Sequence, residues 1–406
     1  MESYCLEEIM EMVQEEDVEF IRLQFTDLLG NLKNIAVTAD QLARVFTNPF
    51  PVEGEVLEGK RRKLYLIPDS KTFAILPWRP QTGKVARFLC DIVDENGKPW
   101  ERSSREILKK TEKKMKQAGY TFVIKPECEF FLFHTDENGL PTNLTHERAG
   151  YLDVSPVDLG ENARRDMVLG LKDMGLPIES SHHEASAGQH EIDIESAGAL
   201  EAADRIMTMR MAVRAIAKRH GLHATFMPKP KMDVDGSAMH IQMELWKDGK
   251  NVLEDESIRD VFLNGIANRT AEIAVFTNPT VNSYKRVLGI PEMIKQPVVP
   301  VTNWNAWKDR AAVEILTPDG TANPYIVLAL CMEAGVLGIQ EAAEKKTVHF
   351  PKNLGDAIHR LKGGNFVKTV LGENVVKIYQ ALKEKEWDTY ERQVTSWEME
   401  EYLHRM

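Results

Sequence analysis

The chain has 406 residues, and 51 Lys and Arg against 62 Asp and Glu give it a formal net charge of −11 at pH 7. The length allows two or three domains, while the acidic balance argues against a nucleic-acid binder, which needs a basic surface field. Four scattered cysteines without a CxxC pair argue against a disulfide framework and favour a reducing, cytoplasmic location. We expect no membrane association, because no segment approaches the uninterrupted apolar length of a membrane span and the acidic start does not resemble a signal peptide.

The first hundred residues are predicted to form a small mixed domain. Apolar residues at helical spacing from Leu6 to Val13 predict a short helix, and alternation at Ile21–Phe25 predicts a strand. One turn and three further strands are expected at residues 27–31, 63–67, 72–76 and 85–93.

A domain boundary is predicted between Gly97 and Ser103, which divides the chain into domains of residues 1–100 and 101–406. Ser103 and Glu106 form a capping-box pair that opens a helix after the boundary. Further helices are expected at 161–174, 199–220, 258–277 and 324–344, and in most of the tail from 356 to 404. Strands and helices without strict alternation predict an α+β fold with an antiparallel sheet and packed helices.

Acidic residues recur at two-residue spacing on the predicted strands, and such side chains point to the same face of a sheet. This spacing groups Glu127 with Glu129, Glu191 with Asp193, and His240 with Gln242 and Glu244, while Glu314 stands in an apolar strand. The face opposite carries apolar residues and Cys128, so we expect that face to pack on the core.

Two interpretations of the acidic face remain open from the pattern alone. It can be solvated, or it can hold divalent cations. Side-by-side carboxylates are unfavourable without a counter-charge, and Glu314 would be stranded without one. His240 is expected to be the only histidine on this face. Oxygen-rich clusters suit Mg²⁺ or Mn²⁺, and two adjacent ions can clamp a transferring phosphoryl group.

Other motifs carry less information. His182-His183-Glu184 does not match the HExxH zinc motif, and neither a P-loop nor a GxGxxG fingerprint occurs in the sequence.

The sequence resembles type I glutamine synthetases from end to end. The matching segments are FIRLQFTDLLGNLKN (Phe20–Asn34), PECEFFLF (Pro126–Phe133), ESSHHEASAGQHEID (Glu179–Asp193), HGLHATFMPKP (His220–Pro230), DGSAMH (Asp235–His240), TNPTVNSYKR (Thr277–Arg286), ANPY (Ala322–Tyr325) and EWDTYERQVTSWEMEEYL (Glu386–Leu403). The resemblance implies an N-terminal β-grasp-like domain followed by a larger catalytic domain. It also implies a homo-oligomer of two stacked hexameric rings, a dodecamer, with each active site shared between neighbouring subunits.

The resemblance implies an ATP-dependent ligase of nitrogen metabolism that phosphorylates glutamate or a related acid for attack by ammonia or an amine. It also implies two or three Mg²⁺ or Mn²⁺ ions in each site. One ion would be held by Glu129, Glu184 and Glu191. A second ion would be held by Glu127, His240 and Glu314.

Further roles are implied residue by residue. Arg286 matches the arginine that grips the substrate carboxylate, and Gly236 and Asp235 belong to the substrate-binding loop. Glu292 matches the flap glutamate that takes a proton from the amine. The remaining assignments place Glu179, Gln242 and Arg310 on the nucleotide side, and Glu53 in the catalytic position of an N-terminal aspartate.

Several positions depart from the family pattern. The N-terminal Asp-Gly-Ser-Ser loop reads Glu-Gly-Glu-Val from Glu53 onward, and the segment after it is shortened. The phosphate-binding stretch between Glu292 and Glu314 is also shorter than in the family. Its positive charges are limited to Lys295, Lys308 and Arg310. Other differences are Asp235 for an asparagine, Ser196 for an aromatic residue, Glu244 for a serine and Leu316 for an arginine.

These departures keep three functional hypotheses open. The chain is an active ligase, or it is a non-catalytic paralogue that binds metal and acts as a regulatory or scaffolding protein, or it catalyses phosphoryl transfer without forming an amide. The complete set of ligands favours the first, because clustered carboxylates are costly without metal. The altered phosphate contacts favour the second, because phosphoryl transfer depends on neutralising developing charge.

Overall fold

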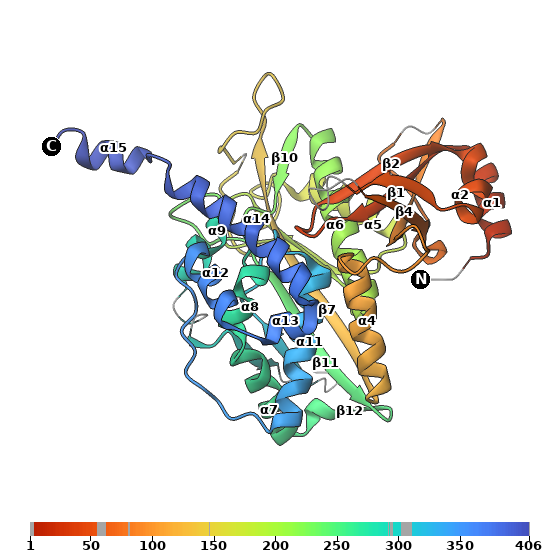
Figure 1. Cartoon of the computed structure of the whole chain (residues 1–406). Coiled ribbons are helices and arrows are strands. Elements are labelled where there is room, and N and C mark those ends of the chain that lie inside the picture. Colours follow the sequence, from red (N-terminus) through yellow and green to blue (C-terminus); the bar gives the residue numbers. More distant parts are fainter. Residues whose placement is uncertain are drawn as a thin grey trace.

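The computed structural model describes residues 4–54, 62–79, 82–145, 147–290, 292, 295–301 and 311–405. Figure 1 shows a smaller N-terminal part, in red and orange, beside a larger part that holds the rest of the chain. The helix α15 projects away from this body at the C-terminal end.

The N-terminal part contains a six-stranded sheet of order β2-β1-β6-β4-β3, with β5 paired to β6. The pairing of β1 with β6 is parallel and the other pairings are antiparallel. Its strands are β1 (Val18–Thr26), β2 (Leu32–Thr38), β3 (Phe50–Glu53), β4 (Lys63–Pro68), β5 (Ala74–Ile75) and β6 (Lys84–Val93). Its helices are α1 (Leu6–Glu15), η1 (Ala39–Gln41), α2 (Leu42–Thr47) and η2 (Ser70–Thr72).

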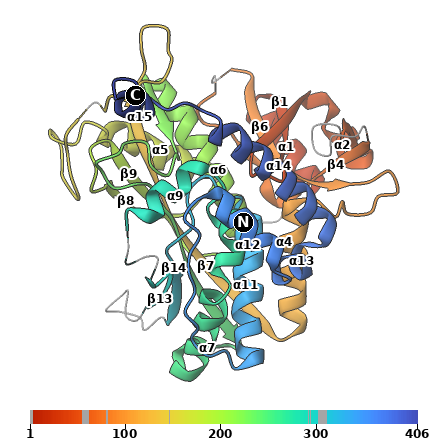
Figure 2. The same ribbon diagram turned by 60° about the vertical axis from the view of Figure 1, so that its left-hand side comes forward.

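The larger part is built on an eight-stranded antiparallel sheet of order β13-β14-β11-β7-β9-β8, with β10 paired to β7 and β12 to β11. Its strands are β7 (Tyr120–His134), β8 (Ile178–His183), β9 (Gln189–Ile194), β10 (Leu222–Thr225), β11 (Met239–Lys247), β12 (Lys250–Asn251), β13 (Val298–Val301) and β14 (Ala312–Ile315). In Figure 2 these strands run along one side of the molecule, with α4 and α11 on the other. The predicted α+β class and antiparallel sheet are confirmed.

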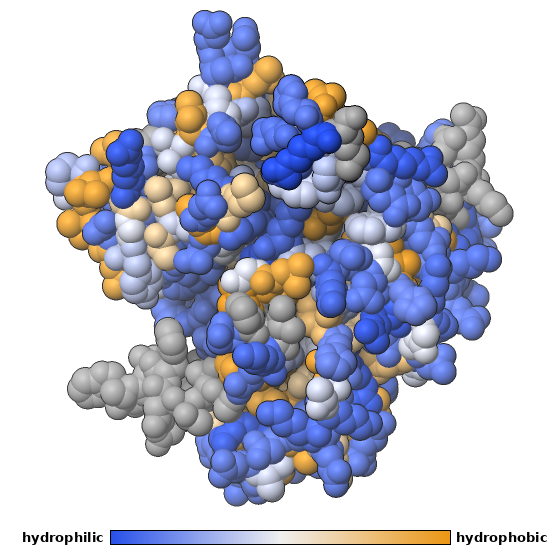
Figure 3. Space-filling model, turned by 90° about the vertical axis from the view of Figure 1, so that its left-hand side faces the viewer, coloured by the Kyte–Doolittle hydropathy of each residue, from blue (hydrophilic) through white to orange (hydrophobic). Residues whose placement is uncertain are grey.

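Helices α4 and α6 pack on this sheet, and further helices pack around them, except α15, which projects away. The helices are α4 (Ser104–Gln117), α5 (Glu161–Asp173), α6 (Ala199–Arg219), η3 (Val252–Glu254), α7 (Glu256–Ala267), α8 (Thr270–Thr277), α9 (Val281–Leu288), α11 (Pro324–Glu341), α12 (Leu354–Gly363), α13 (Phe366–Leu371), α14 (Glu373–Glu391) and α15 (Ser396–Tyr402). Cys128, Met239 and Ile241 face this core and are at most 1% exposed, as the alternation predicts. The face seen in Figure 3 is mostly hydrophilic, with only small, separate hydrophobic areas.

Two sequence predictions about helices need correction, and a third is confirmed. The single helix expected at 258–277 is two helices, α7 and α8, which are interrupted at Asn268 and Arg269 without a glycine or proline. At the start of α4, the Ser103 side chain accepts a hydrogen bond from the backbone N–H of Glu106, so the serine half of the predicted capping box is present. Gly221 ends α6 at a φ of +69°, as expected for a glycine stop.

The helix α11 is long and apolar enough to cross a membrane by length and composition, which differs from our expectation that no segment would reach that limit. Within the described residues, 72% of this helix is buried inside the protein. Its surroundings therefore identify it as a core helix, because a core helix in a large protein can be apolar all round.

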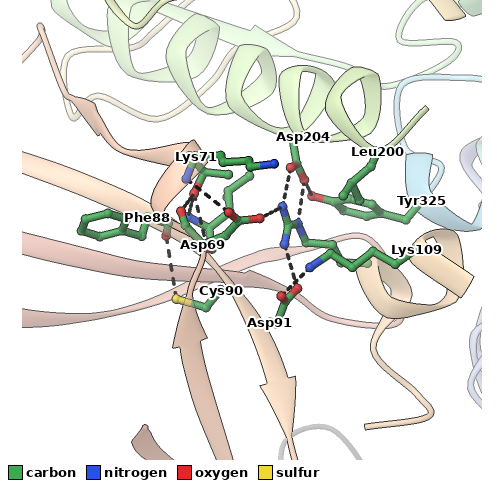
Figure 4. A network of polar contacts seen from close by, with 12 residues as sticks. Asp69, Lys71, Phe88, Cys90, Asp91, Lys109, Leu200, Asp204 and Tyr325 are labelled. Atoms are coloured by element: carbon green, nitrogen blue, oxygen red, sulfur yellow. Dashed lines mark hydrogen bonds and ion pairs between the residues drawn. The ribbon is translucent and has the colours of Figure 1, made fainter. Parts of the chain in front are cut away.

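A buried ionic network centred on Arg105 joins the two parts (Figure 4). The guanidinium is bidentate to Asp204 of α6, with N–O distances of 3.0 and 2.7 Å. It also lies 2.7 Å from Asp91 of β6 and 2.7 Å from Asp69 of the N-terminal part. The Tyr325 hydroxyl of α11 donates to Asp204 across 2.7 Å. Burial alone would raise the pKa of Asp69, but the Arg105 charge and hydrogen bond lower it overall.

Replacing Arg105 by leucine is expected to reduce the free energy of unfolding by about 3–5 kcal/mol, because it leaves the buried Asp204 carboxylate without its cation. Urea unfolding at pH 7 measures the loss. The matched control is Lys113→Leu on the exposed side of α4, which should change stability by less than about 0.5 kcal/mol. Equal stability of the two variants would contradict the role assigned to Arg105.

Candidate functional site

The polar face of the eight-stranded sheet brings the predicted acidic residues together. On β7, Glu127 lies between His240 of β11 and Asp193 of β9 in the strand register. Glu129 pairs with Glu191 on β9. Strand alternation therefore places these groups on one surface, as the sequence predicted.

Glu129 is held in the centre of this face by neutral donors. Its Oε2 accepts hydrogen bonds from Gln189 Nε2 at 2.8 Å and from the backbone N–H of Ala238 at 3.0 Å. Only 9% of the residue is exposed. Burial and the nearby Glu184 charge raise the pKa of Glu129 to about 7, despite the Ala238 hydrogen bond.

His240 lies between two carboxylates. Its Nε2 is 3.6 Å from Glu129 Oε1, and its Nδ1 is 3.7 Å from Glu314 Oε1. Burial and the charge of Arg286 lower the pKa of His240 to about 3, so the imidazole is neutral at pH 7, which is the form that binds metals. Burial, with the Glu127 charge, raises the pKa of Glu314 to about 7.

His182 also belongs to this face, so the expectation that His240 is its only histidine is wrong. His182 pairs with Glu191 in the register of β8 and β9, with Nε2 and Oε2 3.7 Å apart. Its Nδ1 is 3.5 Å from Oε1 of Glu184, which follows β8. These three residues form a cluster with metal-ligand spacing. Burial and the Glu129 and Asp193 charges raise the pKa of Glu191.

Sequence reasoning missed Lys125, a cation on the same face. Its Nζ is 2.9 Å from Glu179 Oε2 and 3.4 Å from Glu127 Oε1. Gln242 Nε2 donates to the same Glu127 oxygen across 2.8 Å. The two-residue spacing from Lys125 to Glu127 and Glu129 could have identified it.

A second buried cluster joins the neighbouring strand residues His183 and His190 to Glu147, which lies in a loop, and to Arg164 of α5. His183 Nε2 is 2.7 Å from Glu147 Oε1, and Arg164 contacts His190 Nδ1 at 2.8 Å. Although Glu147, His183 and His190 also have metal-ligand spacing, each already contacts another polar side chain of this cluster.

Three residues predicted to bind the substrate are Arg286, Gly236 and Asp235. Arg286 of α9 is 1% exposed, and its Nη2 donates to the carbonyl oxygens of Thr317 and Pro318, the latter at 3.1 Å. Gly236 presses against it: a Cβ there would lie 2.8 Å from Arg286 Cγ and 2.1 Å from the carbonyl oxygen of Pro228. Asp235 next to this glycine is exposed.

Three predicted residues lie apart from the cluster or outside the description. Glu53 ends β3, at the edge of the N-terminal sheet, and is exposed. Glu292 is exposed, and its carbonyl oxygen accepts from the backbone N–H of Gln296. Arg310 lies outside the described residues.

Comparisons with known proteins match both parts of the chain. The family model for the glutamine synthetase β-grasp domain matches residues 17–95, and the model for the catalytic domain matches residues 101–402. The division at residue 100 stays a prediction.

Curated relatives match over essentially the whole chain. A glutamine synthetase from Clostridium saccharobutylicum is 42% identical over 450 aligned positions that cover 100% of both chains. This alignment is longer than the 406 residues here, so the relative has segments that this chain lacks. A glutamine synthetase from Staphylococcus epidermidis is 38% identical over 99% of this chain and 98% of its own.

Solved structures agree as well. A structure described as "GmaS/ADP complex-Conformation 1" has a TM-score of 0.85 at 26% identity, covering 97% of this chain and 99% of its own. One described as "Apo GmaS without ligand" has the same TM-score at 27% identity and the same coverage. With both family models matched in order and relatives similar along the full length, the chain belongs to the glutamine synthetase family.

Proposed function

We propose that this chain is an active ATP-dependent ligase that activates glutamate, or a related acid, as an acyl phosphate for attack by ammonia or an amine. The observation that carries the proposal is the convergence of five glutamates and His240 on one face of the sheet. The five glutamates are Glu127, Glu129, Glu184, Glu191 and Glu314. A non-catalytic paralogue could lose these groups without consequence for chemistry, whereas a ligase needs all of them.

The donor set fits divalent cations. We assign Glu129, Glu184 and Glu191 to one Mg²⁺ or Mn²⁺ ion. The second ion is assigned to Glu127, His240 and Glu314. The raised pKa values of Glu129 and Glu314 support the assignment, because they mark carboxylates that lack compensating positive charge. When bound, such ions polarise phosphoryl and carboxyl oxygens and neutralise the developing charge. His182 is a further candidate donor beside Glu184 and Glu191.

The chain's own side chains have separate tasks in the proposal. Arg286 would bind the carboxylate of the acid, and its buried Nε has no hydrogen-bond partner among the described residues. Gly236 packs directly against that arginine, so it would fix the position of the Arg286 side chain that holds the acid. Glu292 would accept a proton from the attacking amine, with Glu53 contributed from the N-terminal part of a neighbouring subunit.

Lys125 is a candidate to replace the phosphate-binding arginines that this sequence lacks. Its ammonium lies between Glu127, assigned to an ion, and Glu179, assigned to the nucleotide side. A fixed positive charge at that position can offset charge on a transferring phosphoryl group. The same task is open to Arg310, which lies outside the described residues.

Phosphate release from ATP, with Mg²⁺ or Mn²⁺ and crossed panels of acids and amines, tests the function. We expect release to require one acid and one amine together. Glu129→Gln should reduce the rate by about 10³-fold, because the substitution removes a charged ligand. The matched control is Glu137→Gln in an exposed hairpin, which should keep the rate. Release with acid alone would support phosphoryl transfer without amide formation, and absence of release would favour the non-catalytic paralogue.

Mn²⁺ affinity is expected to rise by about ten- to a hundredfold between pH 6 and pH 8. Glu129 and Glu314 have pKa values of about 7, so protons compete with the metal below pH 7 and leave above it. Calorimetric titration with Mn²⁺ measures the change. Glu314→Gln should flatten the pH dependence, whereas the Glu137→Gln control should retain it. An affinity that does not vary with pH would contradict the proposed ligands.

Gly236→Ala should lower stability by about 1–3 kcal/mol and raise the KM for the acid more than the KM for the amine. The added methyl group would meet the Pro228 carbonyl oxygen at 2.1 Å, and a backbone atom cannot move aside cheaply. Urea unfolding and steady-state kinetics measure both effects. Gly363→Ala is the control, because a Cβ at Gly363 has open space around it. Similar behaviour of the two variants would argue against close packing at Gly236.

A further inference from the structure

A basic cavity lies between residues of the N-terminal sheet and residues of α6. Figure 1 shows α6 beside the red strands of that sheet. Its volume is about 830 Å³, within the range of about 300–1,000 Å³ typical of small-molecule sites. Four of the lining residues are basic: Lys33, Arg210, Arg214 and Lys383. Among the described residues that line the cavity, none is acidic.

Two of the basic residues already have partners. Lys33 Nζ is 3.8 Å from Asp27, and Lys383 Nζ is 2.8 Å from Glu386. Among the described residues of the lining, the positive charge outside these ion pairs comes from two arginines, the buried Arg210 and the exposed Arg214.

Arg210 and Arg214 are one turn apart on α6, where like charges repel each other. Within the described residues neither forms an ion pair with a carboxylate. Arg210 is 6% exposed; it donates to the carbonyl oxygen of Ala322 at 2.9 Å, and its Nε has no hydrogen-bond partner. The guanidinium of Arg214 lies over the Phe226 ring, with Cζ 5.3 Å from the ring centroid.

Burial is the main cause that lowers the pKa of Arg210 to about 10. The Arg214 charge lowers it further, whereas the charge of the buried Asp319 opposes this shift. A buried guanidinium beside a second guanidinium is costly unless an anion accompanies it. Both arginines line the cavity, and the planar guanidinium group of arginine suits a phosphate or carboxylate group.

Gln24 of β1 also lines the cavity and contributes a hydrogen-bond acceptor to it. The residue is 4% exposed, and its Nε2 lies 3.1 Å from Met211 Sδ. Its Oε1 is buried without a hydrogen-bond partner in the described structure. This atom can only accept, so it calls for a hydroxyl or ammonium donor near the anion.

The cavity is separate from the acidic face. Arg210 Nη2 contacts Met239 Sδ at 3.2 Å, and Met239 points into the core, whereas the next residue, His240, belongs to the acidic face. The sheet thus stands between the two sites.

We propose that this cavity binds a small organic oxyanion, a phosphate or a carboxylate, that also carries a hydroxyl or ammonium group. The oxyanion contacts Arg210 and Arg214, and the donor group contacts Gln24 Oε1. Binding does not depend on the ligase activity proposed above.

The test is calorimetric titration of the full chain with two probes, glycerol 3-phosphate and malate. EDTA removes divalent metal, and NaCl balances the ionic strength. We expect at least one probe to bind, and the probe that binds identifies the phosphate or the carboxylate as the recognised group. Arg214→Gln should weaken this binding at least tenfold. Lys218→Gln, which removes the same charge from an exposed position on α6 outside the cavity, should leave it unchanged.

Two further variants locate the ligand. Glu314→Gln alters the acidic face and should not affect binding of the probe. Gln24→Leu should weaken glycerol 3-phosphate but not methyl phosphate, which has no hydroxyl group. The proposal is overturned if neither probe binds, if Arg214→Gln binds as tightly as the unmodified chain, or if Glu314→Gln alone abolishes binding.

Discussion

The strict alternation of β7 and its neighbours is the constraint on which the rest of the structure depends. One face of the sheet is apolar and buried beneath α4, α6 and α11, and this burial fixes the strand register. A shift of one residue would turn the acidic side chains into the core. The hydrophobic core therefore holds like charges close together, at a separation that those charges would not adopt by themselves.

The crowded carboxylates explain the electrostatics of the site. Glu129 and Glu314 have raised pKa values because each is buried near another carboxylate, while His240 remains neutral between them. Among the described residues, Lys125 and Arg286 are the cations that act on this face, and they are too few to neutralise it. This shortage of positive charge makes the face costly to fold. It also favours the binding of divalent cations.

Much of this site could be predicted from the sequence because strand alternation is a local property. The grouping of Glu127 with Glu129, and of both with His240, needed only their spacing and the assumption of one shared sheet. The position of His182 could not be obtained in this way, because it depends on the pairing of β8 with β9. Likewise, the break between α7 and α8 carries no glycine or proline signal. The contacts of Arg105 and Arg286 join residues far apart in the chain, so only the fold reveals them.

The ionic network at the junction between the two parts tolerates the loss of one aspartate better than the loss of Arg105. Three aspartates, Asp69, Asp91 and Asp204, share Arg105, and Lys109 contacts Asp91. Loss of one aspartate relieves repulsion among the rest, whereas loss of the arginine leaves an excess of negative charge with little access to water. Substitution is therefore better tolerated at the acidic positions of this junction than at Arg105, although the buried Arg87 guanidinium also interacts with Asp204.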